Sequence, residues 1–405
     1  MRTRYGTSPW TSEFPASRRP AFPRFRSDRP ATVVIVGAGL TGSAIAYACA
    51  AAGMEPVVLE AERIGSGTSG RSVGLLNTGP GPLFRDVAAA HGLRAARRVF
   101  ETWRRGALDG AALLRRLNIT CDLGPAAGVL AAPREDEKAL RREYDARSEA
   151  GLDDAWLNAK QLQGAMKLSA AAALRTRDGF TVDPYRAAVG LASAAVERGA
   201  AVFEQSRVKK VGFTRKYADV ITDGGTIRTT AVVVATGSAT PEWRSLRRHF
   251  KRRELYAVMT EPLGAAMREQ LFDSRMTLRD TRVPAHRVRW ARDGRLLVAG
   301  GDQDETPART REAVLVQRTG QLMYELLTMY PAISGLHPQY GWEASYGETA
   351  DGLMYIGPHR NFPHHHFALG GGRDTVTGAF VAARLIVRAI QRTSEKGDDV
   401  FGWNR

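Results

Sequence analysis

Three spaced glycines near the start of the chain, Gly37, Gly39 and Gly42, constrain the fold more than any other feature. The β-branched run 32–36 precedes them and is typical of a buried parallel strand, and the small residues 43–52 that follow favour a helix. Glycines at this spacing permit a tight turn, a close approach of the backbone to a pyrophosphate, and close helix–strand packing. The N-terminus of such a helix also offers N–H donors to phosphates. The pattern predicts a dinucleotide-binding βαβ unit.

An acidic residue completes this unit. The apolar run 56–59 predicts a second buried strand, and Glu60 follows it, eighteen residues after Gly42. A carboxylate at this place accepts hydrogen bonds from both hydroxyls of an adenosine ribose, which argues against a 2′-phosphate and hence against NADP. The alternative, a glycine turn that only joins core elements, does not account for the strand, helix and carboxylate together. The choice between NAD and FAD needs a second signal.

Similar α/β patterns recur in the middle and at the end of the chain. Residues 231–235 predict a buried strand that runs into Thr236-Gly237, and residues 367–369 predict another, followed by the glycine loop 370–372 and a helix over 375–391. We therefore expect one discontinuous nucleotide-binding domain and a second domain inserted in two pieces. The expected boundaries are 31–95, 180–245 and 346–405 for the first domain, and 96–179 and 246–345 for the second.

Residues 1–30 contain five prolines and no periodic apolar pattern, which predicts an extended arm. Trp10, Phe14, Phe22 and Phe25 are unusual in a solvated tail. We expect the arm to lie on the globular body.

The loop after Glu60 gives the second signal, because it runs Arg63-Ile-Gly-Ser-Gly-Thr-Ser-Gly-Arg-Ser72. With it, the sequence resembles the glycine/D-amino-acid oxidase-like (DAO) family of FAD-dependent oxidoreductases, whose members carry a Gly/Ser/Thr-rich loop over the flavin. The resemblance continues at 232–237, at Thr349-Ala-Asp-Gly-Leu353 and at the glycine loop 370–372. It implies an α/β fold with a Rossmann-like FAD domain of the glutathione-reductase/PHBH type and a mixed α+β substrate domain.

The resemblance and the glycine motif together predict the residues that contact FAD. The helix expected to start near Thr375 would direct its positive end at the flavin and stabilise negative charge on the reduced ring. The predicted contacts are Gly37, Gly39, Leu40, Thr41, Gly42, Glu60, Ala61, Gly67, Thr68, Ser69, Arg71, Ser72, Val208, Ala235, Thr236, Gly237, Gly371, Gly372, Arg373, Asp374 and Thr375.

Departures from the family pattern narrow the expected mode of flavin attachment and the expected class of substrate. Some amine-oxidising relatives attach the flavin through a histidine near the place of Arg71, and others through a cysteine where this chain has Ala344 and Ser345. We therefore expect FAD that is bound without a covalent link. Oxidases of simple amino acids hold the substrate carboxylate with an arginine just before the Thr-x-Asp motif, where this chain has 346–348, Tyr-Gly-Glu. This favours an amine or an N-substituted amino acid as the substrate.

The resemblance implies a substrate between the flavin and a sheet built from residues 250–302. The candidates there are Tyr256, Arg279, His286, Arg289 and Trp290, each of which also suits a packing role. The expected reaction is oxidation of a C–N bond by hydride transfer to flavin N5, followed by hydrolysis of the imine, with oxygen or a carrier as the electron acceptor. Two alternatives stay open: a flavoprotein acting on modified tRNA, and a subunit whose FAD is structural.

Composition limits the other classes. The net charge is +16, but only eight of the 58 basic residues are lysine, and the arginines are scattered without an aromatic-interleaved strip, which argues against a nucleic-acid face. The two cysteines, Cys49 and Cys121, have no metal-ligand spacing and favour a reducing cytoplasm. No apolar run is long enough to span a bilayer. Neighbouring residues of the triplet 364–366, His-His-His, point to opposite faces of a strand, so we expect no metal site.

Overall fold

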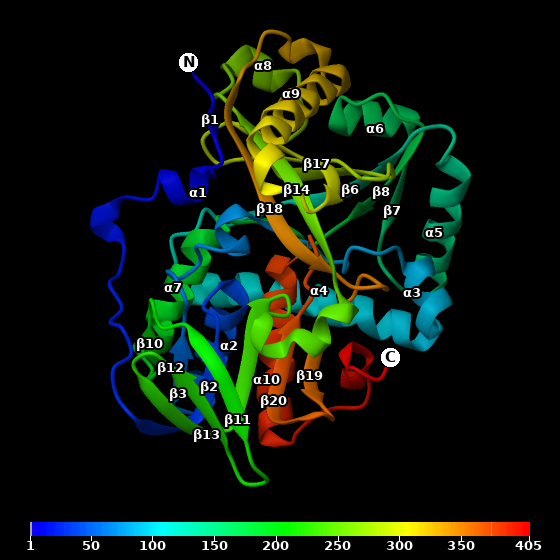
Figure 1. Cartoon of the computed structure of the whole chain (residues 1–405). Coiled ribbons are helices and arrows are strands. Elements are labelled where there is room, and N and C mark those ends of the chain that lie inside the picture. The colour runs from blue at the N-terminus through cyan, green and yellow to red at the C-terminus, as the bar shows by residue number, and fades with distance from the viewer. Residues whose placement is uncertain (1, 374) are drawn as a thin grey trace.

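The computed structural model describes residues 2–373 and 375–405. It is built around two large sheets, one above the other in Figure 1. The lower sheet contains the glycine turn, and its core follows the order β10-β3-β2-β13-β12-β11. β19 and β20 complete it, with β20 paired to both β13 and β19. Its strands are β2 (Arg29–Val36), β3 (Pro56–Leu59), β10 (Ala201–Phe203), β11 (Val208–Phe213), β12 (Ala218–Thr222), β13 (Gly225–Gly237), β19 (Tyr355–His359) and β20 (Phe362–Leu369).

Strands from the start, middle and end of the chain meet in this sheet. β2 pairs in parallel with β3 and β13, and the second half of β13 pairs in parallel with β20. Alternate residues of β2 face opposite ways: Val33 and Ile35 belong to the core under the helices, whereas Val34 and Val36 belong to the core on the other face. Four helices lie on the side of the sheet to which Val33 and Ile35 point: α2 (Leu40–Ala51), α7 (Pro184–Val196), α10 (Thr375–Gln391) and α4 (Leu93–Arg116).

The upper sheet has nine strands in the order β1-β18-β14-β17-β16-β15-β6-β8-β7. One face of it packs on α9, and the opposite face is turned toward the lower sheet and the segments around it. Its strands are β1 (Arg4–Tyr5), β6 (Ala127–Ala132), β7 (Ala155–Asn158), β8 (Ala172–Thr176), β14 (Lys251–Thr260), β15 (Met276–Asp280), β16 (Arg287–Trp290), β17 (Leu296–Asp304) and β18 (Pro338–Glu348).

Smaller elements join the two sheets. A third sheet has three short strands, in which β4 (75–76) and β5 (124–125) each pair with β9 (180–181). The remaining elements are α1 (Pro9–Ser12), α3 (Phe84–His91), α5 (Glu137–Glu149), α6 (Ala159–Met166), α8 (Ala265–Glu269), α9 (Arg311–Met329), β4 (Leu75–Leu76), β5 (Gly124–Pro125), β9 (Phe180–Thr181) and the short 3₁₀ turns η1 (Ala16–Arg18), η2 (Thr68–Arg71), η3 (Pro241–His249), η4 (Ala308–Thr310), η5 (Pro331–Ile333) and η6 (Asp398–Phe401).

Two regions contain elements that the sequence analysis does not predict. The segment 133–178 contributes strands β7 and β8 to the upper sheet. The segment 250–345 contains the nineteen-residue helix α9. Leu315, Leu322 and Leu326 form the buried side of α9, but polar and charged residues cover its other sides and weaken the apolar pattern in the sequence. The domain boundaries given above stay a prediction.

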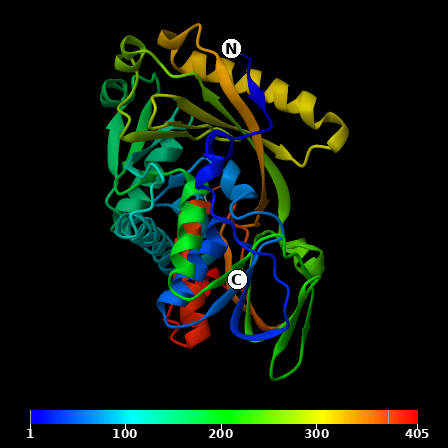
Figure 2. The same ribbon diagram turned by 90° about the vertical axis from the view of Figure 1, so that its left-hand side faces the viewer.

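The N-terminal arm lies on the body, as the sequence predicts, and Figure 2 shows it running along one side from the upper to the lower sheet. β1 adds to the edge of β18 in parallel. Trp10 is buried and its indole Nε1 donates to the carbonyl of Ser72 (2.9 Å). Further along, Phe25 is buried against Phe203 of β10. The arm therefore contacts both sheets.

Candidate cofactor and substrate site

The glycine turn connects β2 to α2 with no space for side chains. A Cβ on Gly42 would lie 1.8 Å from the carbonyl oxygen of Gly37. Gly37 itself has a φ of +97°, and a Cβ there would lie 2.8 Å from the carbonyl oxygen of Ala235 in β13. Glycine is thus required at both positions, and the turn holds the N-terminus of α2 at the carboxyl edge of the lower sheet, where a dinucleotide would lie.

Glu60 directly follows β3 at the same edge. Its Oε2 accepts a hydrogen bond from the backbone N–H of Ala38 (2.7 Å), and its Oε1 accepts one from the N–H of Glu62 (2.9 Å). Burial raises the pKa of Glu60, and these two backbone hydrogen bonds partly offset that rise. Because a carboxylate has about four acceptor positions, both oxygens can still accept a ribose hydroxyl.

The loop after Glu60 folds back onto the start of α2. Ser69 Oγ accepts a hydrogen bond from the backbone N–H of Leu40 (2.8 Å), and Thr68 Oγ1 donates to the carbonyl of Ser345 in β18 (3.1 Å). Arg71 accepts a hydrogen bond at its carbonyl from Trp342 Nε1 (2.8 Å). The 3₁₀ turn η2 therefore connects the glycine turn of the lower sheet to the edge of the upper sheet.

A third glycine segment reaches the same place from the end of the chain. The backbone N–H of Gly370 donates to the carbonyl of Gly237 (2.9 Å), and Gly237 ends β13, which lies beside the glycine turn. A cavity of about 180 Å³ forms where these segments meet. Its lining residues are Thr68, Thr236, Gly237, Ser238, Arg252, Ser345, Tyr346, Gly347, Gly371, Gly372 and Thr375.

The structure brings together most of the predicted cofactor residues. Gly37, Gly39, Leu40, Thr41 and Gly42 form the turn and the first residues of α2, whereas Thr68, Thr236, Gly237, Gly371, Gly372 and Thr375 line the cavity. Ala235 contacts the turn, and Ser69 bonds to it.

The other predicted contacts lie around this centre. Glu60 and Ala61 lie at the end of β3, and Val208 begins β11 close by, since the N–H of Ser206 donates to the carbonyl of Glu60 (2.7 Å). Gly67 and Ser72 flank η2, whose last residue is Arg71. Arg373 follows the glycine loop, and Asp374 lies outside the described residues. Contact of all these residues with FAD stays a prediction.

The two positions that would carry a covalent flavin link in relatives contain no suitable nucleophile. Arg71 Nη1 forms an ion pair with Glu343 Oε1 in β18 (3.2 Å). Ser345 contributes its carbonyl to Thr68, and Ala344 is buried. These contacts are consistent with FAD held by the glycine turn, Glu60 and the loops alone.

A second cavity, of about 90 Å³, lies between the chain that continues from η2 and the upper sheet. Leu75 and Asn77 line it on one side, and Thr277, Arg279 and Arg287 line it on the other. Arg279 and Arg287 lie directly opposite each other on β15 and β16. Arg279 Nη1 donates to the carbonyl of Gly81 (2.6 Å). The cavity therefore presents guanidinium groups to the segment that follows η2, and such groups suit an anionic part of a substrate.

The other substrate candidates lie elsewhere. Tyr256 and Trp290 belong to the core beneath α9, and His286 bonds to Asp280 (2.7 Å) and to Glu325 of α9 (2.8 Å). All three side chains therefore lie on the face of the upper sheet that packs on α9, opposite to the face near η2. Burial alone would lower the pKa of His286, but its two carboxylate partners outweigh burial and raise it.

Arg289 lies on the face of the upper sheet near η2, but its guanidinium donates hydrogen bonds to backbone carbonyls. Its Nη1 donates to the carbonyls of Gly74 (2.6 Å) and Val182 (3.2 Å), and its guanidinium carbon lies 5.1 Å from the ring centre of Trp10. Burial lowers the pKa of Arg289 to about 10. Arg289 thus positions the segment after η2 under the arm.

Two residues of this face were missed from the sequence. Arg287 is two positions before Arg289, so the alternation of a strand could have revealed that both face the same way. Asp302 ends the buried part of β17 after a residue with positive φ, Gly301 (+63°). The sequence pattern Gly300-Gly301-Asp302 was the available signal, since paired glycines interrupt a strand and redirect the side chain that follows.

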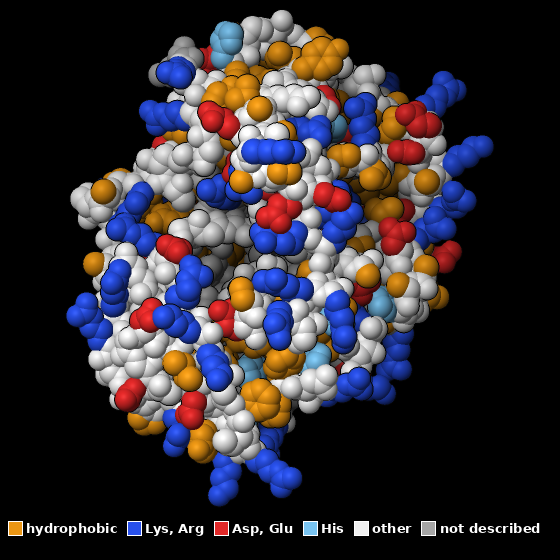
Figure 3. Space-filling model, viewed as in Figure 1, with side chains coloured by type: hydrophobic (Ala, Val, Ile, Leu, Met, Phe, Trp, Pro, Cys, Tyr) orange, Lys and Arg blue, Asp and Glu red, His pale blue; other side chains and the backbone are white. Residues whose placement is uncertain are grey.

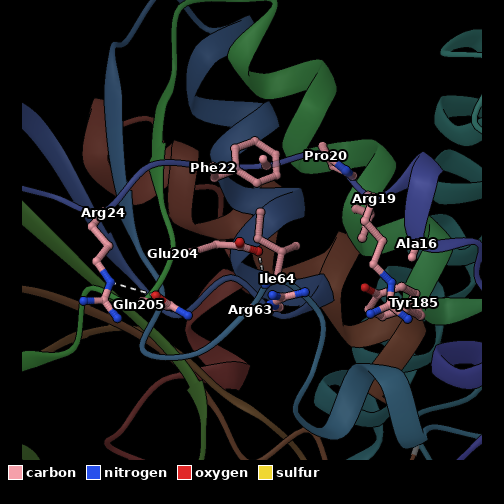
Figure 4. A pocket seen from close by; sticks show the side chains of 12 residues that line it. Ala16, Arg19, Pro20, Phe22, Arg24, Arg63, Ile64, Tyr185, Glu204 and Gln205 are labelled. Atoms are coloured by element: carbon pink, nitrogen blue, oxygen red, sulfur yellow. Dashed lines mark hydrogen bonds between the residues drawn. The ribbon is translucent and has the colours of Figure 1, made fainter.

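The arm forms one wall of a further cavity, of about 350 Å³, beside the loop after Glu60 (Figure 4). Arg19, Phe22 and Arg24 of the arm line it together with Arg63 and Tyr185, and Arg24 Nε donates to Gln205 Oε1 (2.7 Å). It lies outside the glycine turn and the two cavities described above, and its lining residues Arg24 and Arg63 are exposed.

Metal binding requires a cluster of ligating side chains, and membrane insertion requires a long apolar helix. Within 2–373 and 375–405, no three or more His, Cys, Asp or Glu side chains group in a way that could hold a metal ion. In the same ranges no helix is both long and apolar enough to cross a membrane. Burial lowers the pKa of His366 to about 4, and both ring nitrogens of His364 contact backbone carbonyls.

Known proteins share this fold. The chain resembles the solved structures of glycine oxidase from Geobacillus kaustophilus (TM-score 0.77, 20% identity, 92% of this chain and 98% of that one) and L-proline dehydrogenase from P. horikoshii (TM-score 0.75, 17% identity, 93% and 97%). In sequence it is similar to gamma-glutamylputrescine oxidoreductase of Escherichia coli K12, with 26% identity over 90% of this chain and 85% of that protein.

The family comparison covers almost the whole chain apart from the arm and the last residues. Residues 32–389 match the family described as FAD dependent oxidoreductase. The glycine turn, Glu60 and the cavity at the three glycine segments fit this cofactor. The chain belongs to the FAD-dependent oxidoreductase family, and its cofactor is FAD.

Proposed function

We propose that this enzyme oxidises the C–N bond of an amine that also carries an anionic group, such as an N-substituted amino acid. The structural observation that supports the anionic group is the cavity in which Arg279 and Arg287 face the loop after η2. The nitrogen is supported by the names of the relatives. Gamma-glutamylputrescine oxidoreductase matches 90% of this chain, whereas the anaerobic glycerol-3-phosphate dehydrogenase chain of the same organism matches 48% of it.

FAD supplies an acceptor for two electrons and a proton in the form of a hydride. The carbon beside nitrogen would lose that hydride and the nitrogen would lose a proton, leaving an imine that water hydrolyses to a carbonyl compound and an amine. The residues of the chain would bind and orient the substrate: Arg279 and Arg287 would hold its anionic end, and the glycine segments would fix the cofactor beside it. Oxygen or a carrier would then take the electrons.

An anaerobic absorbance titration tests this proposal. The FAD-loaded protein is mixed with glycine, N-methylglycine, L-proline, N-methylputrescine and glycerol 3-phosphate, and the long-wavelength flavin band is followed. We expect bleaching by a compound that has both an amine and a carboxylate. Bleaching by glycerol 3-phosphate alone, or by no amine, would refute the proposed C–N oxidation.

Substitution of the arginines tests where the anionic end binds. We expect Arg279→Ala and Arg287→Ala each to lower kcat/KM by about 10- to 100-fold, because a charge-assisted hydrogen bond contributes about 1.5–3 kcal/mol. Arg282→Ala is the control, since Arg282 is exposed on the adjoining loop. Equal kcat/KM values for all three variants would place the anionic end elsewhere.

A further inference from the structure

Asp302 is a buried carboxylate, and the side chains that bond to it within 2–373 and 375–405 all approach one of its two oxygens. Its side chain has no exposed surface. Oδ1 accepts a hydrogen bond from the Tyr346 hydroxyl (2.7 Å) and forms an ion pair with Arg373 Nε (2.5 Å). Oδ2 is buried and has no hydrogen-bond partner among the residues that the structure describes.

The two partners of Asp302 connect it to the cavity formed by the three glycine segments. Tyr346 lines the cavity formed by the three glycine segments, and Arg373 directly follows Gly371 and Gly372 in the wall of that cavity. Asp302 itself projects from the face of β17 that is turned away from α9, because its neighbour Gln303 bonds to Arg318 of α9. The carboxylate of Asp302 therefore lies on the side of the upper sheet that faces the glycine segment 370–372.

A buried carboxylate oxygen without a donor loses its hydration without replacement, which is costly unless a ligand or a bound molecule supplies a donor. The Tyr346 hydroxyl cannot serve both oxygens with one hydrogen. Burial, followed by the charge of Asp302, raises the pKa of Tyr346 to about 12, so this phenol keeps its proton at neutral pH and stays directed at Oδ1. Oδ2 is the acceptor that the fold leaves available.

We propose that Oδ2 of Asp302 accepts a hydrogen bond from the N–H of a positively charged amine substrate and so selects substrates that carry this group. This inference rests on the proposed function and extends it. Arg287 of β16 lies opposite Ala299 of β17, three residues before Asp302, on the same face of the sheet. At about 3.3 Å per residue, the two side chains begin roughly 10 Å apart. The substrate class is then a zwitterion, with its anionic end at the arginines and its nitrogen at Asp302.

The test compares two ligands on two variants. The ligands are the panel amine that reduces the wild-type flavin and the fully N-methylated form of that amine, which keeps the charge but has no N–H. The variants are Asp302→Asn and the control Asp304→Asn, an exposed aspartate two residues further along, paired with Lys251 and Arg253. FAD content is measured first by absorbance, and binding of each ligand is then followed by the shift of the flavin spectrum without oxygen.

We expect the wild type and Asp304→Asn to bind the N–H form about 10- to 100-fold more tightly than the methylated form. Asp302→Asn should lose most of this preference with FAD still bound, and the methylated form should lose less affinity than the N–H form, because it loses only its charge attraction to the carboxylate. An Asp302→Asn protein that keeps the preference would overturn the inference, as would one that loses both ligands equally. If no panel amine reduces the wild type, the proposed function itself fails, and that result appears before any variant is made.

Tyr346→Phe covers the case in which Asp302→Asn does not retain FAD. This change removes the hydroxyl donor to Oδ1 and leaves the carboxylate and its ion pair with Arg373. We expect the preference for the N–H form to persist, because Oδ2 provides it. Loss of the preference in Tyr346→Phe would assign the selection to the phenol and contradict the role of Asp302.

Discussion

At the residue scale, glycines determine where the cofactor can lie. A Cβ on Gly42 would lie 1.8 Å from the Gly37 carbonyl oxygen, far inside the van der Waals contact distance, and the contact is with backbone, so no side chain could move away. The neighbouring cavity depends on the same property, because Gly370 meets Gly237 through a direct backbone hydrogen bond. The cofactor site is thus formed largely by main-chain atoms.

Gly42→Ala tests this arrangement. We expect the purified variant to lose most of its FAD and about 1–3 kcal/mol of stability, because the turn must open to admit the methyl group. FAD absorbance per chain and the thermal unfolding midpoint measure the two effects. Gly164→Ala in α6 is the matched control, since a Cβ there meets nothing within 4 Å. Full FAD content in Gly42→Ala would contradict the tight-turn assignment.

His286 gives a pH prediction. Its raised pKa in the folded protein means that its contribution to stability is fully present below the unfolded pKa of about 6.5 and is lost as the pH rises through the folded pKa. We expect the free energy of unfolding of the wild type to fall over that range, and that of His286→Gln to fall less. Urea unfolding at a series of pH values measures this. His337→Gln, at an exposed site, should behave as the wild type; an unchanged slope in His286→Gln would disprove the assignment.

At the scale of elements, the arm and η2 act together. The Ser8 hydroxyl donates to the carbonyl of Gly70, and a Cβ on Gly70 would lie 2.8 Å from Thr11 Cγ2. Glu13 accepts two hydrogen bonds from the guanidinium of Arg295 in the loop before β17 (2.7 Å each). The loop expected to cover the flavin is therefore pressed between the arm and the edge of β18.

Trp10→Ala should release this contact. Loss of the buried indole removes the hydrogen bond to Ser72 and the contact with Arg289, and truncation of a buried Trp costs about 3–5 kcal/mol. We expect faster FAD release and proteolytic cleavage of the arm within 12–26, with the upper sheet still folded. Dilution-induced flavin fluorescence and limited proteolysis measure these effects.

Leu93→Ala is the control for Trp10→Ala, because the Leu93 side chain is largely exposed. An FAD release rate for Trp10→Ala equal to that of Leu93→Ala would show that the arm does not hold the loop.

The sequence predicted local elements better than their partners. The βαβ unit, the strand 56–59 and the helix 375–391 agree with β3 and α10 because short apolar runs and glycine turns are local signals. α9 and β18 were missed, since α9 is apolar on one side only and β18 mixes Tyr, Trp, Glu and Ser along an edge. The paired glycines before Asp302 indicate an interrupted strand, but the surroundings of this carboxylate depend on Tyr346 and Arg373, which are distant in sequence.

At the scale of the whole molecule, charge is spread out. Figure 3 shows Lys and Arg side chains distributed over one face among acidic and neutral ones, with no continuous basic strip on that face. Many of the arginines form ion pairs, such as Arg104 with Asp178 and Arg253 with Asp304. The net charge of +16 is thus a sum over many separate positions.

This distribution bears on the tRNA alternative. We expect weak binding of unmodified tRNA at low salt and no saturable complex at about 0.15 M salt, where isolated contacts are screened. Fluorescence anisotropy of labelled tRNA at two salt concentrations measures this, with an acidic protein of similar size as the reference. Saturable binding that persists at the higher concentration would revive the alternative.

The position of the arm sets an order on folding in the cell. Arg4 and Tyr5 pair with Tyr340 and Gly341, so β1 can pair only after the residues of β18 have been synthesised. β2 must likewise wait for β13, and β13 for β20. Until β18 has been made, the loop 63–72 lacks its hydrogen bonds to that strand. Residues 370–372, which complete the cofactor cavity, are made later than β18, so we expect FAD to bind only after the arm has a strand to pair with.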